Sequence, residues 1–418
     1  MKLVLHFPPK NKILIYAQLI LVMFVFFLRD FLHFPSFVTY ITDLVLVLIL
    51  LQSFQRIKRC SRKYTKTQWH IFLFICIALV LGVIFNLVNP LHVMWGIRNN
   101  LRFFLFFFIC VSLLDEVDVE KLNNFLKAYF LLTVVFCTFQ YFVLGLVNDD
   151  LGGFFGIGKG CNAYINVLIC FISALVISEY FTKKRSFTYM SVFLILCIYI
   201  ATLAELKIFY VELVCMILIS ILFNKPSLKT IVILFFGVVS VFLAFNLLLK
   251  YNPDSLSFFL DSNARRYYLA GEGYTNSGDL NRFTAIQNIY QKFFSENPFQ
   301  SIFGFGIGSC DTSSFSFLQS EFFNRYEYLH YRWFTHAWVF LEQGFIGIIL
   351  LVSFFISNLT FSLKNKKKLK NYSLLSILFV FCCLVGIIYN CSLELEAGYL
   401  IAFMCSIPFI LIKNGEIK

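Results

Sequence analysis

Charged residues are scarce in this chain. Lys, Arg, Asp and Glu make up 14% of its 418 residues, whereas 59% are hydrophobic. Soluble enzymes and disordered chains carry far more charge, so both classes are excluded. Eleven or twelve apolar stretches of about 16 to 22 residues recur, and each is about long enough to cross a ~30 Å hydrocarbon core as a helix. The composition therefore predicts an all-α, polytopic helical bundle, a single integral membrane domain over residues 1–418.

Motifs for disulfides and metals are also missing. The 13 Cys are scattered, mostly within apolar stretches, with no CxxC pair and no Cys/His spacing suited to a metal. This excludes a disulfide scaffold and predicts neither a metal site nor a cofactor. The chain also has no tandem repeat and no inverted pattern of broken apolar segments, which disfavours a secondary transporter.

The distribution of basic residues predicts the topology. The net charge of +12 comes largely from runs at 56–66, 183–185 and 364–370. With a cytoplasmic amino terminus and an uncleaved first span, these runs all fall inside, and both termini are cytoplasmic. They are interpreted as topology signals, so no nucleic-acid partner is expected. The predicted spans are 12–28, 37–54, 69–88, 99–114, 126–147, 162–180, 187–203, 208–223, 231–249, 336–357, 372–390 and 396–412.

One connection, residues 250–335, is much longer than the others and is predicted to be a large periplasmic loop. Loops of this length are usually functional. Apolar residues at three- and four-residue steps after Ser277-Gly278-Asp279 predict an amphipathic helix over about 280–295. Arg282 then falls in its first turn, either near an anion or paired with Asp279 or Glu296. The following Gly304-Phe305-Gly306-Ile307-Gly308 is interpreted as a tight turn against the bundle or a ligand.

His336 lies where the loop enters the tenth predicted span. Thr335 is expected to cap that helix, which leaves His336 in the first turn. The positive helix end and partial burial disfavour a cationic ring, so we expect a neutral imidazole able to act as a general base. The alternative is an interfacial histidine in an aromatic belt with Trp333 and Trp338. Glu342, one to two turns deeper, is a supporting candidate because ionisable groups within spans are often functional.

Basic residues on the predicted outer face form a candidate anion site. Arg98 and Arg102 stand four residues apart at the start of the fourth predicted span, so they share a helical face and could grip one phosphate. Lys207 lies at the turn between the seventh and eighth spans, and Arg265 and Arg266 lie in the long loop. A diphosphate ligand would explain several cations close to the hydrocarbon. Snorkelling toward lipid head groups is the alternative, most of all for Lys207.

In their order along the chain, these motifs resemble the O-antigen ligase and O-antigen polymerase superfamily. The resemblance rests on Arg282, Asn297-Pro298-Phe299, the glycine turn, and His336 followed by Leu341-Glu342-Gln343-Gly344-Phe345-Ile346-Gly347. It implies a metal-independent glycosyltransferase of the GT-C type in the bacterial inner membrane. Arginines of the family hold the diphosphate of an undecaprenyl-linked donor, and the histidine serves the acceptor hydroxyl. These roles would fall to Arg282 and His336.

The resemblance favours a polymerase of undecaprenyl-diphosphate-linked oligosaccharide repeat units in O-antigen or capsule assembly. A ligase that transfers finished chains to lipid A core is the alternative with the same donor. A flippase or exporter of the same lipid-linked sugars is the alternative from another class. The implied partners are the lipid-linked oligosaccharide and membrane lipids, with a chain-length regulator protein as a further candidate.

Overall fold

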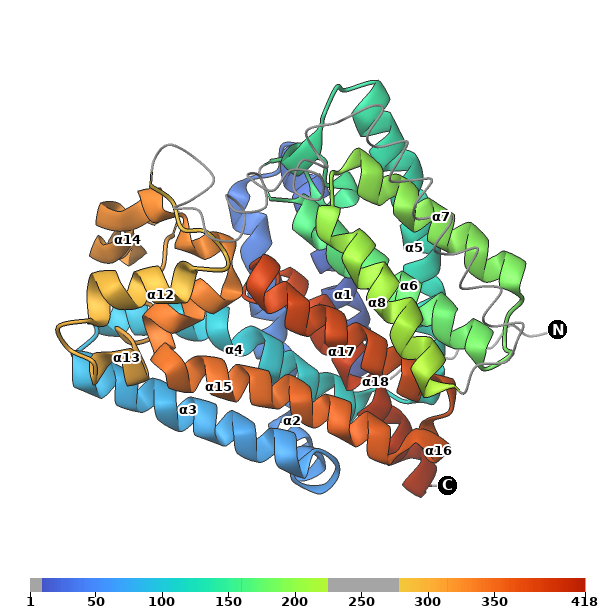
Figure 1. Ribbon diagram of the computed structural model, residues 1–418. Helices are drawn as coiled ribbons and strands as arrows, with labels where there is room; N and C mark the ends of the chain where they lie inside the picture. Colours follow the sequence, from blue (N-terminus) through green and yellow to red (C-terminus); the bar gives the residue numbers. More distant parts are fainter. Residues whose placement is uncertain (1–9, 159, 225–277, 314, 418) are drawn as a thin grey trace.

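The chain folds into a bundle of long helices. The computed structural model describes residues 10–158, 160–224, 278–313 and 315–417, and no strand occurs among them (Figure 1). The long helices are α1 (Lys10–Asp30), α2 (Ile41–Tyr64), α3 (Lys66–Asn86), α4 (Pro90–Leu113), α5 (Glu116–Phe142), α6 (Asn162–Phe181), α7 (Phe187–Leu203), α8 (Lys207–Phe223), α15 (Thr335–Lys364), α17 (Asn371–Tyr389) and α18 (Ala397–Ile417).

This arrangement confirms a helical membrane protein. Eleven of the twelve predicted spans fall on described residues, and each of them is a helix; the remaining one, 231–249, lies outside the described residues. Nine described helices are long and apolar enough to cross a membrane. The other two, α7 and α8, have 17 residues each. At 1.5 Å per residue they extend about 25 Å, short of a ~30 Å hydrocarbon core. A total of twelve spans and the GT-C arrangement stay predictions.

Three helices form the centre of the bundle. The most apolar windows of α4, α6 and α18 are 78%, 83% and 83% buried, against 33%, 28% and 28% for α1, α2 and α3. Phenylalanine rings fill this centre: Phe104 and Phe107 of α4 each meet Phe354 of α15 edge to face, with ring centroids 5.1 Å apart. Such edge-to-face contacts are favoured by the charge distribution of aromatic rings. The outer helices expose large apolar side chains, as lipid-facing helices do.

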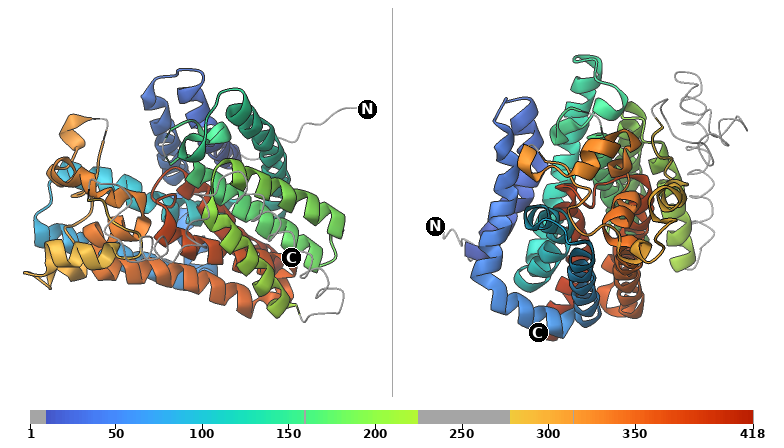
Figure 2. Two further views of the ribbon diagram at one scale, coloured as in Figure 1. Left: turned by 45° about the horizontal axis from the view of Figure 1, so that its top comes forward. Right: turned by 90° about the vertical axis from the view of Figure 1, so that its left-hand side faces the viewer.

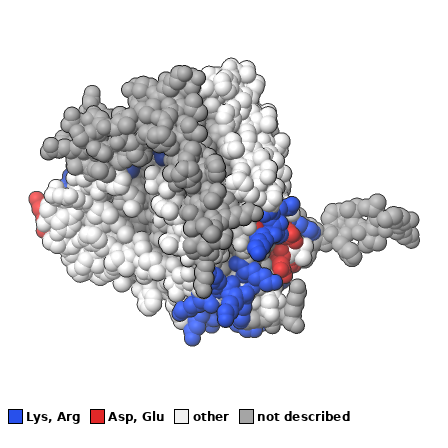
Figure 3. Space-filling view, turned by 45° about the vertical axis from the view of Figure 1, so that its right-hand side comes forward, with Lys and Arg blue, Asp and Glu red and all other residues white. Residues whose placement is uncertain are grey.

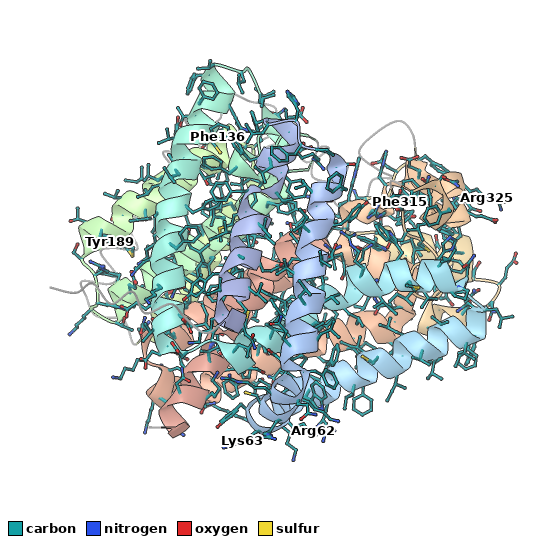
Figure 4. All side chains as sticks on the ribbon, turned by 180° about the vertical axis from the view of Figure 1, so that it is seen from behind. Arg62, Lys63, Phe136, Tyr189, Phe315 and Arg325 are labelled. Carbon is teal, nitrogen blue, oxygen red and sulfur yellow. The ribbon has the colours of Figure 1, made fainter. Side chains whose placement is uncertain are left out.

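The two ends of the bundle differ in character. Short helices of the segment after residue 277, α12 (Ala285–Ile289), α13 (Gln300–Phe303) and α14 (Glu321–Tyr326), gather at one end, which faces the viewer on the right of Figure 2. The 30-residue α15 runs from there to α16 (Lys366–Leu369) at the other end (Figure 1). Lys and Arg gather in one region of the surface in Figure 3, and Arg62 and Lys63 lie far from Phe315 and Arg325 in Figure 4. The bundle therefore has a basic end and a loop end.

The amphipathic helix begins later than predicted. The Asn281 side chain accepts a hydrogen bond from the Phe283 N–H at 3.0 Å, and the Asn281 carbonyl accepts one from the Thr284 N–H at 3.1 Å. These contacts close a turn, so α12 starts at Ala285 and a π-helical turn, Tyr290–Phe294, completes it. The prediction that Arg282 lies in the first helical turn was wrong, since asparagine satisfies the backbone of a turn as readily as it caps a helix.

The glycine turn packs against a break in α15, as a turn against the bundle was predicted to do. Gly344 has φ 63° and interrupts the helix. The carbonyls on its amino-terminal side accept hydrogen bonds from the turn: Phe305 N–H reaches Leu341 O at 2.7 Å, and Gly306 N–H reaches Glu342 O at 3.0 Å. Because a break leaves helical carbonyls without their usual donors, the turn replaces those donors and fixes the loop to the bundle.

Replacing Gly308 by Ala tests this attachment. Gly308 has φ 80°, and an added Cβ would overlap the carbonyl oxygen of His92 in α4. Strain in the left-handed region plus this overlap should lower the free energy of unfolding by at least about 2 kcal/mol. Equilibrium unfolding in mixed micelles measures the loss. Gly415→Ala in α18, where a Cβ meets open space, is the control and should leave stability unchanged or slightly higher; equal stability of both variants would contradict the proposed packing.

Candidate functional site

His336 occupies the first turn of α15, as predicted, but Thr335 does not cap the helix. The N-cap residue is Phe334, in an extended conformation. Thr335 instead donates from its hydroxyl and from its N–H to the Asn390 carbonyl, both at 2.9 Å. Asn390 follows the last residue of α17, so these two hydrogen bonds tie the start of α15 to the end of α17. The hydroxyl serves a tertiary contact that sequence spacing does not reveal.

The His336 ring is held between two backbone carbonyls. Nδ1 lies 3.1 Å from the Ile387 oxygen, and Nε2 lies 2.8 Å from the Arg282 oxygen. The residue is 5% exposed. Carbonyl oxygens only accept hydrogen bonds, and a neutral imidazole has one N–H, so a neutral ring can donate to one of the two at a time. The arrangement brings Arg282 and His336 together, as two predicted site residues, through the Arg282 backbone.

The Arg282 guanidinium lies over two aromatic rings. Its Cζ is 4.1 Å from the centroid of Tyr389 and 5.4 Å from that of Phe334. A guanidinium over an aromatic face is attracted by the ring's negative face, and the attraction grows as water is excluded. Arg282 therefore stands beside the junction of α15 and α17, the same junction that holds His336.

Arg98 and Arg102 converge on one anion, but that anion is a carboxylate of the protein. Arg98 Nη2 lies 3.4 Å and Arg102 Nη1 3.2 Å from Glu396 Oε1, and Arg98 Nε lies 2.6 Å from Asp43. Both arginines sit within α4 rather than at its start, because that helix begins at Pro90. The shared helical face was predicted correctly. Its partner was missed, because Glu396 lies about 300 residues away along the chain.

A second ion pair continues this polar cluster into the loop. The buried Asp311 carboxylate accepts a hydrogen bond from the Asn99 amide and lies 3.4 Å from Arg332 Nη2. Burial raises the pKa of Asp311 above its usual value, while Arg332 and Asn99 oppose the shift. The Arg332 Cζ is 4.3 Å from the Trp338 ring centroid. One chain of contacts thus runs from α4 through the loop to α15.

Glu342 holds the glycine turn in place. It is 1% exposed and accepts hydrogen bonds from the Cys310 N–H and from the Asn100 amide, each at 3.2 Å. Backbone N–H groups are donors that a buried carboxyl group needs, since it has lost its water. The Asn100 contact ties Glu342 to α4, the helix that also carries Arg98 and Arg102. Through these hydrogen bonds Glu342 positions the loop.

A cavity of about 300 Å³ opens beside Arg332. Its walls carry aromatic and charged side chains: Glu327, His330, Tyr331, Arg332, Trp333 and Trp338. The His330 and Trp333 rings stack with centroids 4.2 Å apart. Apolar rings with a few polar groups are typical of sites for small organic ligands. His336 and Arg282 are not among the described residues that line this cavity; its wall residue Trp338 lies two residues after His336 on α15.

The remaining predicted site residues lie elsewhere or outside the described part of the chain. Lys207 begins α8, and in the described residues it shares no hydrogen bond or ion pair with His336, Arg98 or Arg102. Arg265 and Arg266 lie outside the described residues. The sequence did not predict the residues that complete the polar cluster, which are Asp43, Asp311, Arg332, Glu394 and Glu396. A visible signal was Glu394-Leu395-Glu396, two carboxyl groups between closely spaced apolar stretches.

Comparison with known proteins assigns no family. No protein-family model matches the chain, and no curated protein matches it in sequence. The resemblance to the O-antigen ligase and polymerase superfamily therefore stays a prediction.

Replacing Glu396 by Gln tests whether the shared carboxylate stabilises the fold. The change leaves Arg98 and buried Arg102 without their common anion, which typically costs about 3 to 5 kcal/mol of unfolding free energy. Unfolding in mixed micelles measures the effect. Glu120→Gln is the control, because Glu120 is 63% exposed and lies 3.8 Å from Lys184; surface ion pairs contribute little. If the two variants unfold alike, Glu396 does not stabilise the bundle.

Glu394 predicts a specific pH dependence of stability. Burial, and then repulsion by Glu342, raise the pKa of Glu394 to about 8. A raised carboxyl pKa means that the folded state holds the proton more tightly, so the stability from the neutral group is present at low pH and lost as pH rises toward 8. Glu394→Gln does not titrate. It should melt at least about 2 °C above the natural chain at pH 8.5, and the difference should shrink at pH 5. A difference independent of pH would contradict this assignment.

Proposed function

We propose that this protein is a membrane glycosyltransferase that polymerises undecaprenyl-diphosphate-linked oligosaccharide repeat units of a bacterial surface polysaccharide. The observation that carries the proposal is the junction where the His336 ring meets the Arg282 backbone; an aromatic cavity beside Arg332, lined in part by Trp338 of the same helix, supports it. Aromatic faces and charged rims suit a sugar, which presents apolar C–H faces and hydroxyl groups. A volume of about 300 Å³ is enough for one or two sugar rings.

A lipid-diphosphate donor sets modest chemical demands. The diphosphate is already a good leaving group, so the protein needs positive charge where the leaving anion develops and a base near the attacking hydroxyl. Arg282 is the candidate for the diphosphate ligand because its backbone carbonyl meets His336 Nε2. Arg98 and Arg102 already share Glu396, and a phosphate would have to displace that carboxylate. We expect Arg98 and Arg102 to stabilise the polar cluster that supports the cavity.

His336 would act through Nε2. In the tautomer protonated on Nδ1, the Ile387 carbonyl accepts the Nδ1–H, a contact of the kind that fixes the orientation of catalytic histidines. Nε2 then carries the lone pair, which faces the Arg282 carbonyl. Two lone pairs repel, so the acceptor hydroxyl takes the place of that carbonyl when substrate binds. The hydroxyl gives its proton to Nε2, its oxygen bonds to the anomeric carbon, and the bond from that carbon to the diphosphate oxygen breaks.

A ligase would use the same donor chemistry with a different acceptor. Deletion of the gene separates the two activities. Single unpolymerised repeats on the lipopolysaccharide indicate a polymerase, whereas long chains that remain on undecaprenyl diphosphate indicate a ligase. A flippase or exporter of the same lipid-linked sugars is the candidate from another class, and it would place its cations in a central cavity.

Substitutions at His336 and Arg282 test the assignment in such a deletion strain. His336→Ala should lower polymer formation by about 10² to 10⁴, the usual contribution of a general base. Arg282→Lys should also impair it, because lysine lacks the planar fork that binds phosphate at two points. A polysaccharide gel measures chain length.

His70→Ala, an exposed position on α3, is the control and should leave the polymer unchanged. His336→Gln can still donate to the Ile387 carbonyl, so it separates loss of a base from loss of a structural contact. Natural polymer levels in either His336 variant would reject the catalytic role, provided each variant accumulates in the membrane like the natural chain.

A further inference from the structure

Three potential metal ligands meet inside the bundle. They are Cys170 on α6, Glu212 on α8 and Cys382 on α17, and their ligand atoms all lie within 4.8 Å of one another. All three residues are buried. One Glu212 oxygen accepts hydrogen bonds from the Cys170 thiol and from the Asn166 amide, each at 3.1 Å. The three residues come from helices that are far apart in sequence, so no sequence motif predicts this group.

The buried carboxyl group needs a positive partner or a proton. Glu212 is 1% exposed and lies within an apolar helix. No ion pair of Glu212 occurs in the described residues, although Arg and Lys compensate other buried carboxylates of this protein. Ionisable groups within membrane helices are costly and mark functional sites by default. A cation bound by the thiols and the carboxylate would offset the free-energy cost of burying the charge of Glu212.

A small cavity lies beside these potential ligands. It measures about 30 Å³, and its walls include Asn166, Cys170, Glu212 and Cys382. The side-chain oxygen of Asn166 is buried and has no hydrogen-bond partner among the described residues. Buried polar atoms are nearly always satisfied, so an unsatisfied oxygen on a cavity that three ligand residues share indicates a bound species. The volume fits a single ion or water molecule.

We propose that this cavity binds one divalent transition metal, most suitably Zn²⁺, through Cys170, Cys382 and Glu212. The fourth position falls to the Asn166 oxygen or to a water. Zinc prefers tetrahedral sites of thiolate and oxygen ligands, with Zn–S of about 2.3 Å and Zn–O of about 2.0 to 2.2 Å. Tetrahedral geometry then sets ligand atoms about 3.5 Å apart, between the 3.1 Å and 4.8 Å of the group.

The charge and proton balance suit such a site. Each thiol gives up its proton on binding, as does Glu212 where its carboxyl group is protonated, and the released protons leave to solvent. Two thiolates and a carboxylate with Zn²⁺ carry a net charge of about −1, the same as a structural site of three cysteines and one histidine. Ion binding would clamp α17 against α6 and α8. Ile387 of α17 and Asn390, which follows that helix, line the same cavity, and their carbonyls contact His336 and Thr335.

Metal analysis of the purified full-length chain tests the site without reference to activity. We expect about one zinc per chain by mass spectrometry of the metals, lost at least about tenfold in Glu212→Gln and in Cys382→Ser. Cobalt substitution should give thiolate-to-metal absorption in the near ultraviolet that the same two variants lack. Cys197→Ser is the matched control, a buried thiol on α7 outside the group, and should keep the metal.

Three results would overturn the proposal. They are a metal content far below one per chain together with no thiolate absorption of added Co²⁺, equal metal in the natural chain and both site variants, or equal loss in the Cys197 control. The metal readout does not depend on glycosyl transfer, so failure of the zinc site leaves the proposed function standing, and the reverse also holds.

Discussion

The polar cluster at the loop end depends on one carboxylate. Glu396 accepts from Arg98 and from buried Arg102 of α4, and it also accepts from Tyr164 of α6 at 3.0 Å. Because charges within an apolar bundle are tolerated only in pairs, this group fixes how α4, α6 and the start of α18 meet. Asn99 and Asp311 extend the cluster toward the loop. The cavity next to Arg332 therefore rests on a pairing made inside the bundle.

A break in one helix joins the loop to that bundle. Gly344 interrupts α15, and the carbonyls freed on its amino-terminal side accept N–H groups of the glycine turn. Glu342 adds a side-chain acceptor for Cys310 from the same stretch. The glycine turn also lies against α4, where Gly308 and Gly96 approach so closely that neither position has room for a side chain. Backbone hydrogen bonds therefore hold the loop together with a buried apolar cluster, in which Ile289 and Phe294 of the loop pack with Phe340 of α15.

Sequence reasoning succeeded where the signal is local. The predicted span 187–203 coincides with α7, and His336 falls in the first turn of α15 as expected. It failed where two local uses compete: Asn281 closes a turn instead of leading into a helix, and Thr335 bonds Asn390 instead of capping. It also placed Arg98 and Arg102 on one face without their partners. A basic residue in an apolar stretch shows that an anion is needed, but several carboxylates in the chain could supply it.

The sequence by itself determined that this is a helical membrane protein and where its helices run. A membrane-spanning helix needs about twenty consecutive apolar residues, so its position can be predicted from the local sequence. Only the tertiary structure decided which charges pair and which ligands meet. Arg98 and Glu396 are separated by 298 residues, and Cys170 and Cys382 come from distant helices. Such contacts depend on how helices pack against one another, and the pattern within any one helix leaves that choice open.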